Sequence, residues 1–104
     1  MFDGKQYKVL IADDDSIVSD VLSRKLLVAG FEVSMVDNGQ KALDKLKEEK
    51  FDLLLMDLTM PEVDGFQVLT EIKELDLKMP IIVMSNLSQP EDIKKAKSLG
   101  AWNY

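Results

Sequence analysis

A short apolar run that ends in an aspartate and is soon stopped by a proline constrains this chain more than any other feature. The run covers residues 51–57, and Pro61 follows it closely. Such a run is typical of a strand buried on both faces of a parallel sheet. Proline has no backbone N–H to donate, so Pro61 ends any strand ladder. The sequence therefore predicts Asp57 at the carboxyl end of a central strand, where open α/β sheets carry their chemistry.

Composition limits the chemistry that this strand end can perform. The chain has 104 residues, which is enough for one domain, and its hydrophobic content of 46% excludes disorder. A net charge of −6 argues against direct binding of nucleic acid, and no apolar run is long enough to span a membrane. Cys and His are both absent, which excludes thiol catalysis, the usual zinc sites and serine–histidine triads. The lack of cysteine also makes the cytoplasm the expected location.

Four apolar runs read as strands. Residues 8–12, 52–56 and 80–84 are apolar almost throughout, which predicts burial on both faces. Residues 31–36 instead alternate apolar and polar side chains, which predicts a half-exposed edge strand. The apolar side chains of that strand are Phe31, Val33 and Met35. Because a helical pattern follows each strand after a short loop, we expect a parallel sheet with right-handed crossovers and helices on both faces.

The four predicted helices have recognisable starts and apolar stripes. Asp15 or Ser16 caps the first helix, a turn at residues 37–39 precedes the second, Asp64 caps the third, and residues 88–91 form a capping box for the fourth. The first helix has apolar residues at helical spacing, namely Ile17, Val18, Val21, Leu22, Leu26 and Ala29. The stripes of the second and third are Ala42, Leu43 and Leu46, then Phe66, Val68, Leu69, Ile72 and Leu75. Ile93, Ala96 and Leu99 line the fourth.

Acidic side chains follow two of these strands. If the first and third strands are neighbours, Asp13, Asp14 and Asp57 converge at one edge of the sheet. Clustered carboxylates repel, so they either raise a pKa or hold a cation. Oxygen ligands suit Mg²⁺, which also binds phosphoryl oxygens, and a carboxylate beside Mg²⁺ can attack phosphorus. Ser85, at the end of the fourth strand, would then be placed to hydrogen-bond a phosphoryl oxygen.

Simpler interpretations exist for each residue taken singly. The acidic run 13–15 can cap the first helix, Asp57 can be an ordinary loop residue, and Ser85 can be a strand-end cap. A calcium-binding EF-hand loop starting at Asp13 fails, because Val18 stands where the turn glycine belongs. Capping does not explain an acidic strand end with no helix starting directly after it, which favours a site.

Four segments together resemble the receiver domain of response regulators in two-component signalling, of the chemotaxis type. They are residues 8–15, residues 56–65 with the pattern Asp-Leu-x-Met-Pro-x-x-Asp-Gly, residues 81–85 and residues 99–101. The resemblance covers nearly the whole chain, in the right order and spacing. It implies a flavodoxin-like (βα)₅ fold with the parallel strand order 2-1-3-4-5. An aspartate-nucleophile phosphatase of the haloacid type fits less well, because it needs a second aspartate where Thr59 stands.

The resemblance also implies roles for individual residues. Asp57 is expected to be the phosphoacceptor for a phosphoryl group from the phosphohistidine of a sensor histidine kinase. Asp14 is expected to bind Mg²⁺ directly, Asp13 through water, and Thr59 through its backbone carbonyl. The domain would then be no enzyme in the usual sense, but a phosphoacceptor that catalyses its own phosphotransfer, with an unknown output protein.

The switch residues are implied in the same way. Ser85 resembles the switch hydroxyl, and Tyr104 stands at the position of the switch aromatic. Asn86 departs from the family, in which the residue after the hydroxyl is usually small, and this is expected to alter access to the phosphoryl group.

A further departure concerns the carboxyl-terminal part of the pattern. The family places a lysine three positions after the switch aromatic, then a fifth helix. We therefore expect residues 1–104 to be a single receiver domain that is incomplete, lacking this lysine, most of strand five and helix five. Asp57 would then bind Mg²⁺ but accept phosphate poorly. The exposed fourth strand would favour self-association or segment swapping, and lost burial would expose an apolar patch on helices one and four. The alternative function is a truncated or degenerate receiver-like module that acts only through protein contacts.

Overall fold

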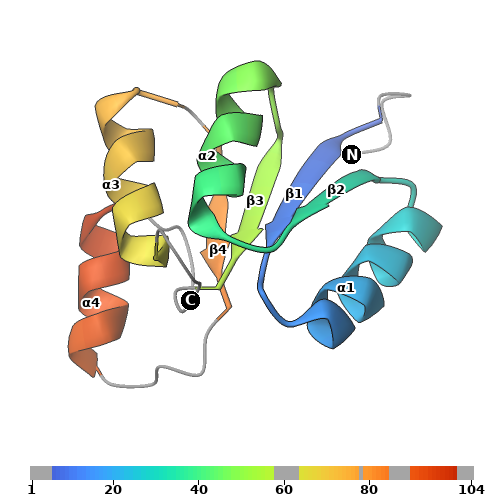
Figure 1. The fold of residues 1–104 in the computed structure, drawn as a ribbon, viewed down its shortest axis with the longest axis horizontal. Helices are drawn as coiled ribbons and strands as arrows, with labels where there is room; N and C mark the ends of the chain where they lie inside the picture. The colour runs from blue at the N-terminus through green and yellow to red at the C-terminus, as the bar shows by residue number, and fades with distance from the viewer. Residues whose placement is uncertain (1–5, 58–63, 78, 85–89, 101–104) are drawn as a thin grey trace.

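The computed structural model of the chain describes residues 6–57, 64–77, 79–84 and 90–100. Strands and helices alternate along these residues, as the sequence predicts (Figure 1). The elements are β1 (Lys8–Ala12), α1 (Ser16–Val28), β2 (Glu32–Val36), α2 (Gly39–Glu48), β3 (Leu53–Met56), α3 (Gly65–Glu74), β4 (Ile81–Val83) and α4 (Pro90–Ser98). Within the described ranges, no helix has the length and apolar character needed to cross a bilayer.

The strands form one parallel sheet in the order β2-β1-β3-β4. This confirms the flavodoxin-like fold class and the part of the 2-1-3-4-5 order that the described residues cover. The edge position predicted for β2 is confirmed as well. In the register, Ala12 at the end of β1 lies beside Met56 of β3 and Val36 of β2. Residues 101–104, where a fifth strand was expected to begin, lie outside the described residues.

One face of the sheet carries most of the hydrophobic core. Alternate strand residues, such as Leu10 and Met56, project toward α2, α3 and α4 and are fully buried. The stripes predicted for α2 and α3 supply the other side of this core. Its buried members are Leu10, Ala12, Ala42, Leu43, Leu46, Phe51, Leu54, Met56, Val68, Leu69, Ile72, Ile81, Val83 and Ala96. Leu75, which was expected in the α3 stripe, is 47% exposed, because it stands at the end of the helix as its C-cap.

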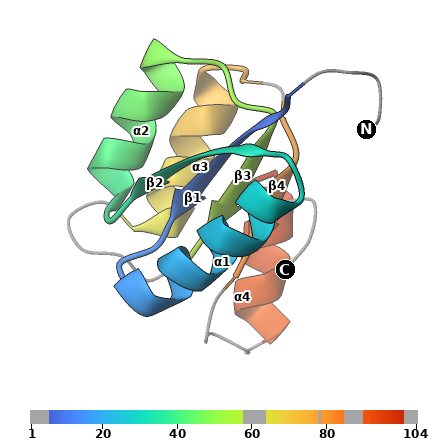
Figure 2. The ribbon, with the colours of Figure 1, turned by 90° about the vertical axis from the view of Figure 1, so that its right-hand side faces the viewer.

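The opposite face of the sheet is covered by α1 (Figure 2). Its core has three buried residues, Val9, Ile11 and Leu55, with partly buried Leu22 and Leu26 of α1 packed against them. The apolar positions predicted for α1 therefore fall into two groups, one packed against the sheet and one exposed. The remaining ones, Ile17, Val18, Val21 and Ala29, are exposed, whereas the helix residues that are buried are the small polar Ser19 and Ser23.

Side-chain caps start α1, α2 and α3 where the sequence places them, whereas the capping box predicted for α4 at residues 88–91 lies partly outside the described residues. Asp15, rather than Ser16, caps α1, and its carboxylate accepts the N–H groups of Ile17 and Val18 at 3.0 and 3.3 Å. Asn38 accepts the N–H of Lys41 at 2.8 Å at the start of α2. Since uncapped N–H groups at a helix start are costly, these side chains fix where each helix begins. The cap of α1 matters most for function, because it lies directly after β1.

Candidate metal and phosphoryl site

The carboxyl ends of β1 and β3 bring the predicted acidic residues together. The ladder between these strands continues one residue past β3, where the Asp57 N–H donates to the carbonyl of Ala12 at 2.9 Å. On the other side, the Asp13 N–H donates to the carbonyl of Val36 at 3.1 Å. Asp13 and Asp57 therefore start from backbone that the sheet holds in place. The assumption that the first and third strands are neighbours is confirmed.

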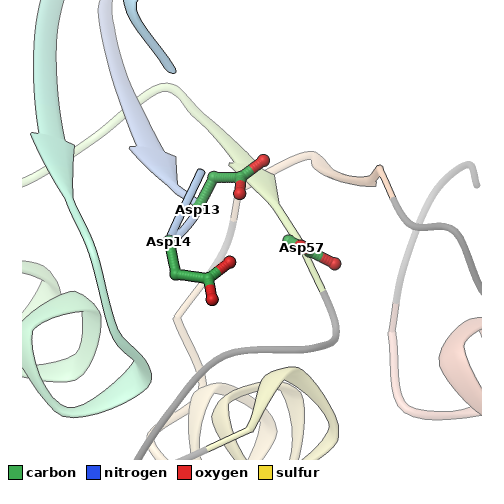
Figure 3. A group of neighbouring side chains, drawn as sticks. All are labelled: Asp13, Asp14 and Asp57. Carbon is green, nitrogen blue, oxygen red and sulfur yellow. The ribbon is translucent and has the colours of Figure 1, made fainter. Parts of the chain in front are cut away.

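Three carboxylates converge at this edge. Asp13, Asp14 and Asp57 each offer an oxygen, and these oxygens lie within 4.8 Å of one another. Figure 3 shows Asp13 and Asp14 leaving the segment after β1 and Asp57 leaving the segment after β3. Asp13 is buried, Asp57 is partly buried and Asp14 is exposed. The group therefore has one deep carboxylate and two that a ligand from solution can reach.

Hydrogen bonds hold both the carboxylate and the backbone of Asp13 in a defined position. The N–H of Asp15 donates to Asp13 Oδ1 at 2.9 Å, so the residue that caps α1 also orients the deepest acid. The hydroxyl of Ser19, one turn into the helix, lies 3.4 Å from the carbonyl of Asp13. Sequence reasoning missed Ser19, because the helical pattern alone does not say which side of α1 meets the sheet. The helix start and the acidic segment thus form one unit.

The electrostatics of the group favour a cation. The pKa of Asp13 is raised above its usual value, first because burial disfavours the charged form and then because Asp57, Asp14 and Asp15 are negative. The hydrogen bond from Asp15 acts in the opposite direction. A divalent ion would relieve the same repulsion by neutralising the carboxylates.

The residues present fit Mg²⁺. Its octahedral shell, at about 2.1 Å, places neighbouring oxygens about 3 Å apart and opposite ones about 4 Å apart. Carboxylate oxygens within 4.8 Å of one another reach these positions with small side-chain movements or through one bridging water. Oxygen ligands alone, with no nitrogen or sulfur ligand, are the set that Mg²⁺ prefers.

An open groove adjoins the acidic group between α1 and the end of β2. It holds about 700 Å³ and is lined by Asp14, Ile17, Val21 and Met35, among others. Met35 is 51% exposed here, although the alternation in β2 placed it with the apolar side chains. Met35 belongs to an edge strand, which among the described residues has a neighbouring strand on one side only. The groove gives the acidic site an apolar border.

Three predicted site residues lie outside the described residues. These are Thr59, expected to offer a carbonyl to the metal, and the switch residues Ser85 and Tyr104. The structure therefore brings together Asp13, Asp14 and Asp57 of the predicted set, and the other roles stay predictions.

Comparison with known proteins identifies the family of this arrangement. Residues 9–104 match the profile of the response regulator receiver domain. The chain belongs to this family. The receiver domain is similar to the chemotaxis protein CheY of Bacillus subtilis, with 37% identity over 99 residues, 94% of this chain and 82% of CheY. It is also 36% identical over 101 residues to the transcriptional regulatory protein ZraR of Klebsiella oxytoca, covering 97% of this chain but 23% of ZraR.

Solved structures agree with this assignment. A CheY-like receiver domain protein from Methanospirillum hungatei has a TM-score of 0.91 and 27% identity, over 96% of this chain and 80% of that chain. The receiver domain of the Francisella response regulator 1452 has a TM-score of 0.90 and 26% identity, over 95% of this chain and 82% of that chain. The chain thus spans less than a quarter of ZraR but most of CheY from Bacillus subtilis. Its class of function is phosphorylation-controlled signalling in two-component systems.

Proposed function

We propose that this receiver domain accepts a phosphoryl group on Asp57 from the phosphohistidine of a sensor histidine kinase, with Mg²⁺ bound by Asp13, Asp14 and Asp57. The observation that carries the proposal is the convergence of the three carboxylates at the carboxyl ends of adjacent parallel strands, within 4.8 Å. The backbone carbonyl of Thr59 would complete the protein ligands. Bound Mg²⁺ would supply positive charge for the phosphoryl oxygens.

Each residue of the proposed site would have its own role in phosphoryl transfer. A carboxylate oxygen of Asp57 attacks phosphorus, the new O–P bond forms, and the P–N bond to the imidazole breaks with its electron pair going to the nitrogen. Asp13 and Asp14 anchor the positive charge beside this oxygen. Asp57 is partly exposed, so a phosphohistidine presented by another protein can reach it. The domain is therefore a phosphoacceptor that catalyses its own phosphorylation and turns over no separate substrate.

Phosphorylation would act by biasing two conformations. In this proposal the hydroxyl of Ser85 binds the phosphoryl oxygens, and Tyr104 turns inward as Ser85 moves. An output protein, or another part of a longer protein, would recognise the second conformation. A cytoplasmic location, the absence of direct nucleic-acid and membrane binding, and self-association through the β4 edge stay predictions of the same scheme.

Mass spectrometry with a small phosphodonor tests the proposal. Part of the protein incubated with Mg²⁺ and acetyl phosphate should gain one phosphoryl group, and the gain should vanish in Asp57→Asn or when EDTA removes the metal. Asp52→Asn is the matched control, because Asp52 precedes the same strand at its other end and should leave the gain unchanged.

The alternative is a module that acts only through protein contacts. A chain that binds Mg²⁺ but gains no phosphoryl group from acetyl phosphate, or from a phosphorylated kinase domain, would favour this alternative. Phosphorylation that persists in Asp57→Asn would place the acceptor elsewhere and contradict the proposal.

A further inference from the structure

Asp15 links the deepest carboxylate of the site to the start of α1. Its backbone N–H donates to Asp13 Oδ1 at 2.9 Å, and its own carboxylate accepts the N–H groups of Ile17 and Val18 at 3.0 and 3.3 Å. The carboxylate of Asp15 is thus directed at the helix, and it is not one of the three that converge at the sheet edge. Asp15 therefore contacts the acidic group through its backbone and the helix through its side chain.

Further hydrogen bonds close a ring between Asp13, Asp15 and Ser19. The Ser19 N–H donates to the carbonyl of Asp15 at 3.0 Å, as expected for the first hydrogen bond of a helix that Asp15 caps. Ser19 is buried, and its hydroxyl donates to the carbonyl of Asp13 at 3.4 Å. The ring connects the backbone of Asp13, its carboxylate and the first turn of α1. The position of the deep carboxylate therefore depends on the residue at which the helix begins.

The sequence offers two neighbouring caps for α1. Aspartate and serine are both favoured cap residues, and Ser16 directly follows Asp15. The structure uses Asp15, whose backbone is extended, with φ −86° and ψ 104°. A helix capped by Ser16 would begin one residue later, and the direction of the Asp15 N–H would no longer be fixed by the cap. The choice between these two caps therefore decides how firmly the Asp13 carboxylate is held.

We propose that Asp15 is a positioning residue of the metal site, which raises Mg²⁺ affinity by fixing the start of α1 and not by acting as a ligand. This inference rests on the proposed function, because it takes Asp13 as part of a Mg²⁺ site. Carboxylates that are already oriented lose less conformational freedom when an ion binds, so their affinity is higher. Asp15 orients Asp13 through its backbone N–H. Any side chain that caps α1 equally well should therefore preserve the effect.

Exchange of the cap residue tests the proposal, with Mg²⁺ affinity measured by isothermal titration calorimetry. Asp15→Ala and Asp15→Ser remove the same charge, but only serine can cap the helix at this position. Asp15→Ala should bind Mg²⁺ about fivefold more weakly than Asp15→Ser. This is less than the loss that follows deletion of an outer-shell partner, because the N–H remains and only its direction changes. Asp15→Ser should stay within about twofold of the parent, since it loses only an exposed charge that salt screens.

A measurement without metal and two control variants complete the test. In EDTA, the backbone amide at position 15 should be better protected from hydrogen exchange in the parent and in Asp15→Ser than in Asp15→Ala, as measured by NMR. Ser16→Ala leaves the cap of α1 in place and should change neither this protection nor Mg²⁺ affinity. Asn38→Ala removes the side chain that accepts the Lys41 N–H at the start of α2. It should lower the midpoint of urea unfolding but leave Mg²⁺ affinity unchanged.

The outcomes separate this inference from the proposed function. Equal Mg²⁺ affinities in Asp15→Ala and Asp15→Ser, with normal binding by the parent, overturn the inference alone, because capping then has no effect on the site. A loss of affinity in Asn38→Ala as large as that in Asp15→Ala also overturns it, since any weakened helix start would then be sufficient. A parent chain that binds no Mg²⁺ overturns the proposed function, and this inference with it.

Discussion

The two ends of the parallel sheet both gather carboxylates, and the described residues of the amino end neutralise theirs with lysines of the chain. At the amino end, Glu49 accepts from Lys8 Nζ at 2.6 Å and from Lys45 Nζ at 2.9 Å. Asp52 accepts the backbone N–H of Lys8 at 2.8 Å. The hydrogen bonds from the two lysines, Lys8 first, lower the pKa of Glu49 to about 2.

At the carboxyl end of the sheet, the described acidic residues repel one another. Burial and neighbouring acids raise the pKa of Asp13, so its charge is disfavoured by the fold that presents it. The lysine that lines the adjoining groove, Lys41, pairs with Asp37 at 3.0 Å. A structural network satisfies its charges internally, whereas a binding site keeps an excess for a partner. The contrast therefore separates the amino end of the sheet from the end that carries the proposed site.

The largest expected effect is on metal affinity. Asp14→Asn should weaken Mg²⁺ binding about tenfold or more, because it removes a charged ligand from the site. Isothermal titration calorimetry at constant ionic strength measures the dissociation constant. Asp52→Asn removes a carboxylate from the amino end and should leave Mg²⁺ affinity unchanged. Equal losses of Mg²⁺ affinity in Asp14→Asn and Asp52→Asn would contradict the proposed difference between the two ends of the sheet.

A smaller effect is expected on stability without metal. Asp13→Asn should raise the free energy of unfolding by about 1 kcal/mol in EDTA, because it removes a buried charge and its repulsion. The amide oxygen can still accept the Asp15 N–H. Urea denaturation measures the change. With Mg²⁺ present, the difference in unfolding free energy between Asp13→Asn and the parent should shrink or change sign. The reason is that the ion stabilises the native protein more when it binds more tightly. A variant less stable than the parent in EDTA would contradict this.

The smallest effect is a difference in pH dependence. The lowered pKa of Glu49 contributes stability that is complete above 4.5 and is lost as the pH falls toward about 2. The raised pKa of Asp13 does the reverse: its penalty is full at high pH and fades as the pH falls through the raised value toward 3.8.

Unfolding measured across this acidic range separates the two contributions. Glu49→Gln should lower stability slightly at neutral pH, less so at high salt, and the loss should vanish in acid. Asp13→Asn should be most stabilising at neutral pH and lose its advantage in acid. Parallel curves for the two variants would show that the ends do not differ in charge balance.

Much of the fold and part of the site follow from local sequence patterns. The strand ends at Ala12 and Met56, the cap at Asp15 or Ser16 and the stripe of α2 were all predictable, because periodicity and capping act over a few residues. The α1 stripe was the main failure. Its pattern indicated a helix, but Ile17 and Val21 face solvent, since helical spacing alone does not say which side meets the sheet.

The sequence by itself determined that acidic residues follow two buried strands and that a hard cation suits them. The family resemblance already implied that β1 and β3 are neighbours, which the structure confirms. Only the tertiary structure decided that Asp13 is buried beside Asp57, and that α1 turns Ser19 inward and Val28 outward. The physical reason is the distance along the chain over which each interaction acts. Hydrogen-bonding patterns and turns depend on adjacent residues, whereas burial, and with it the pKa of Asp13, depends on which distant segments pack together.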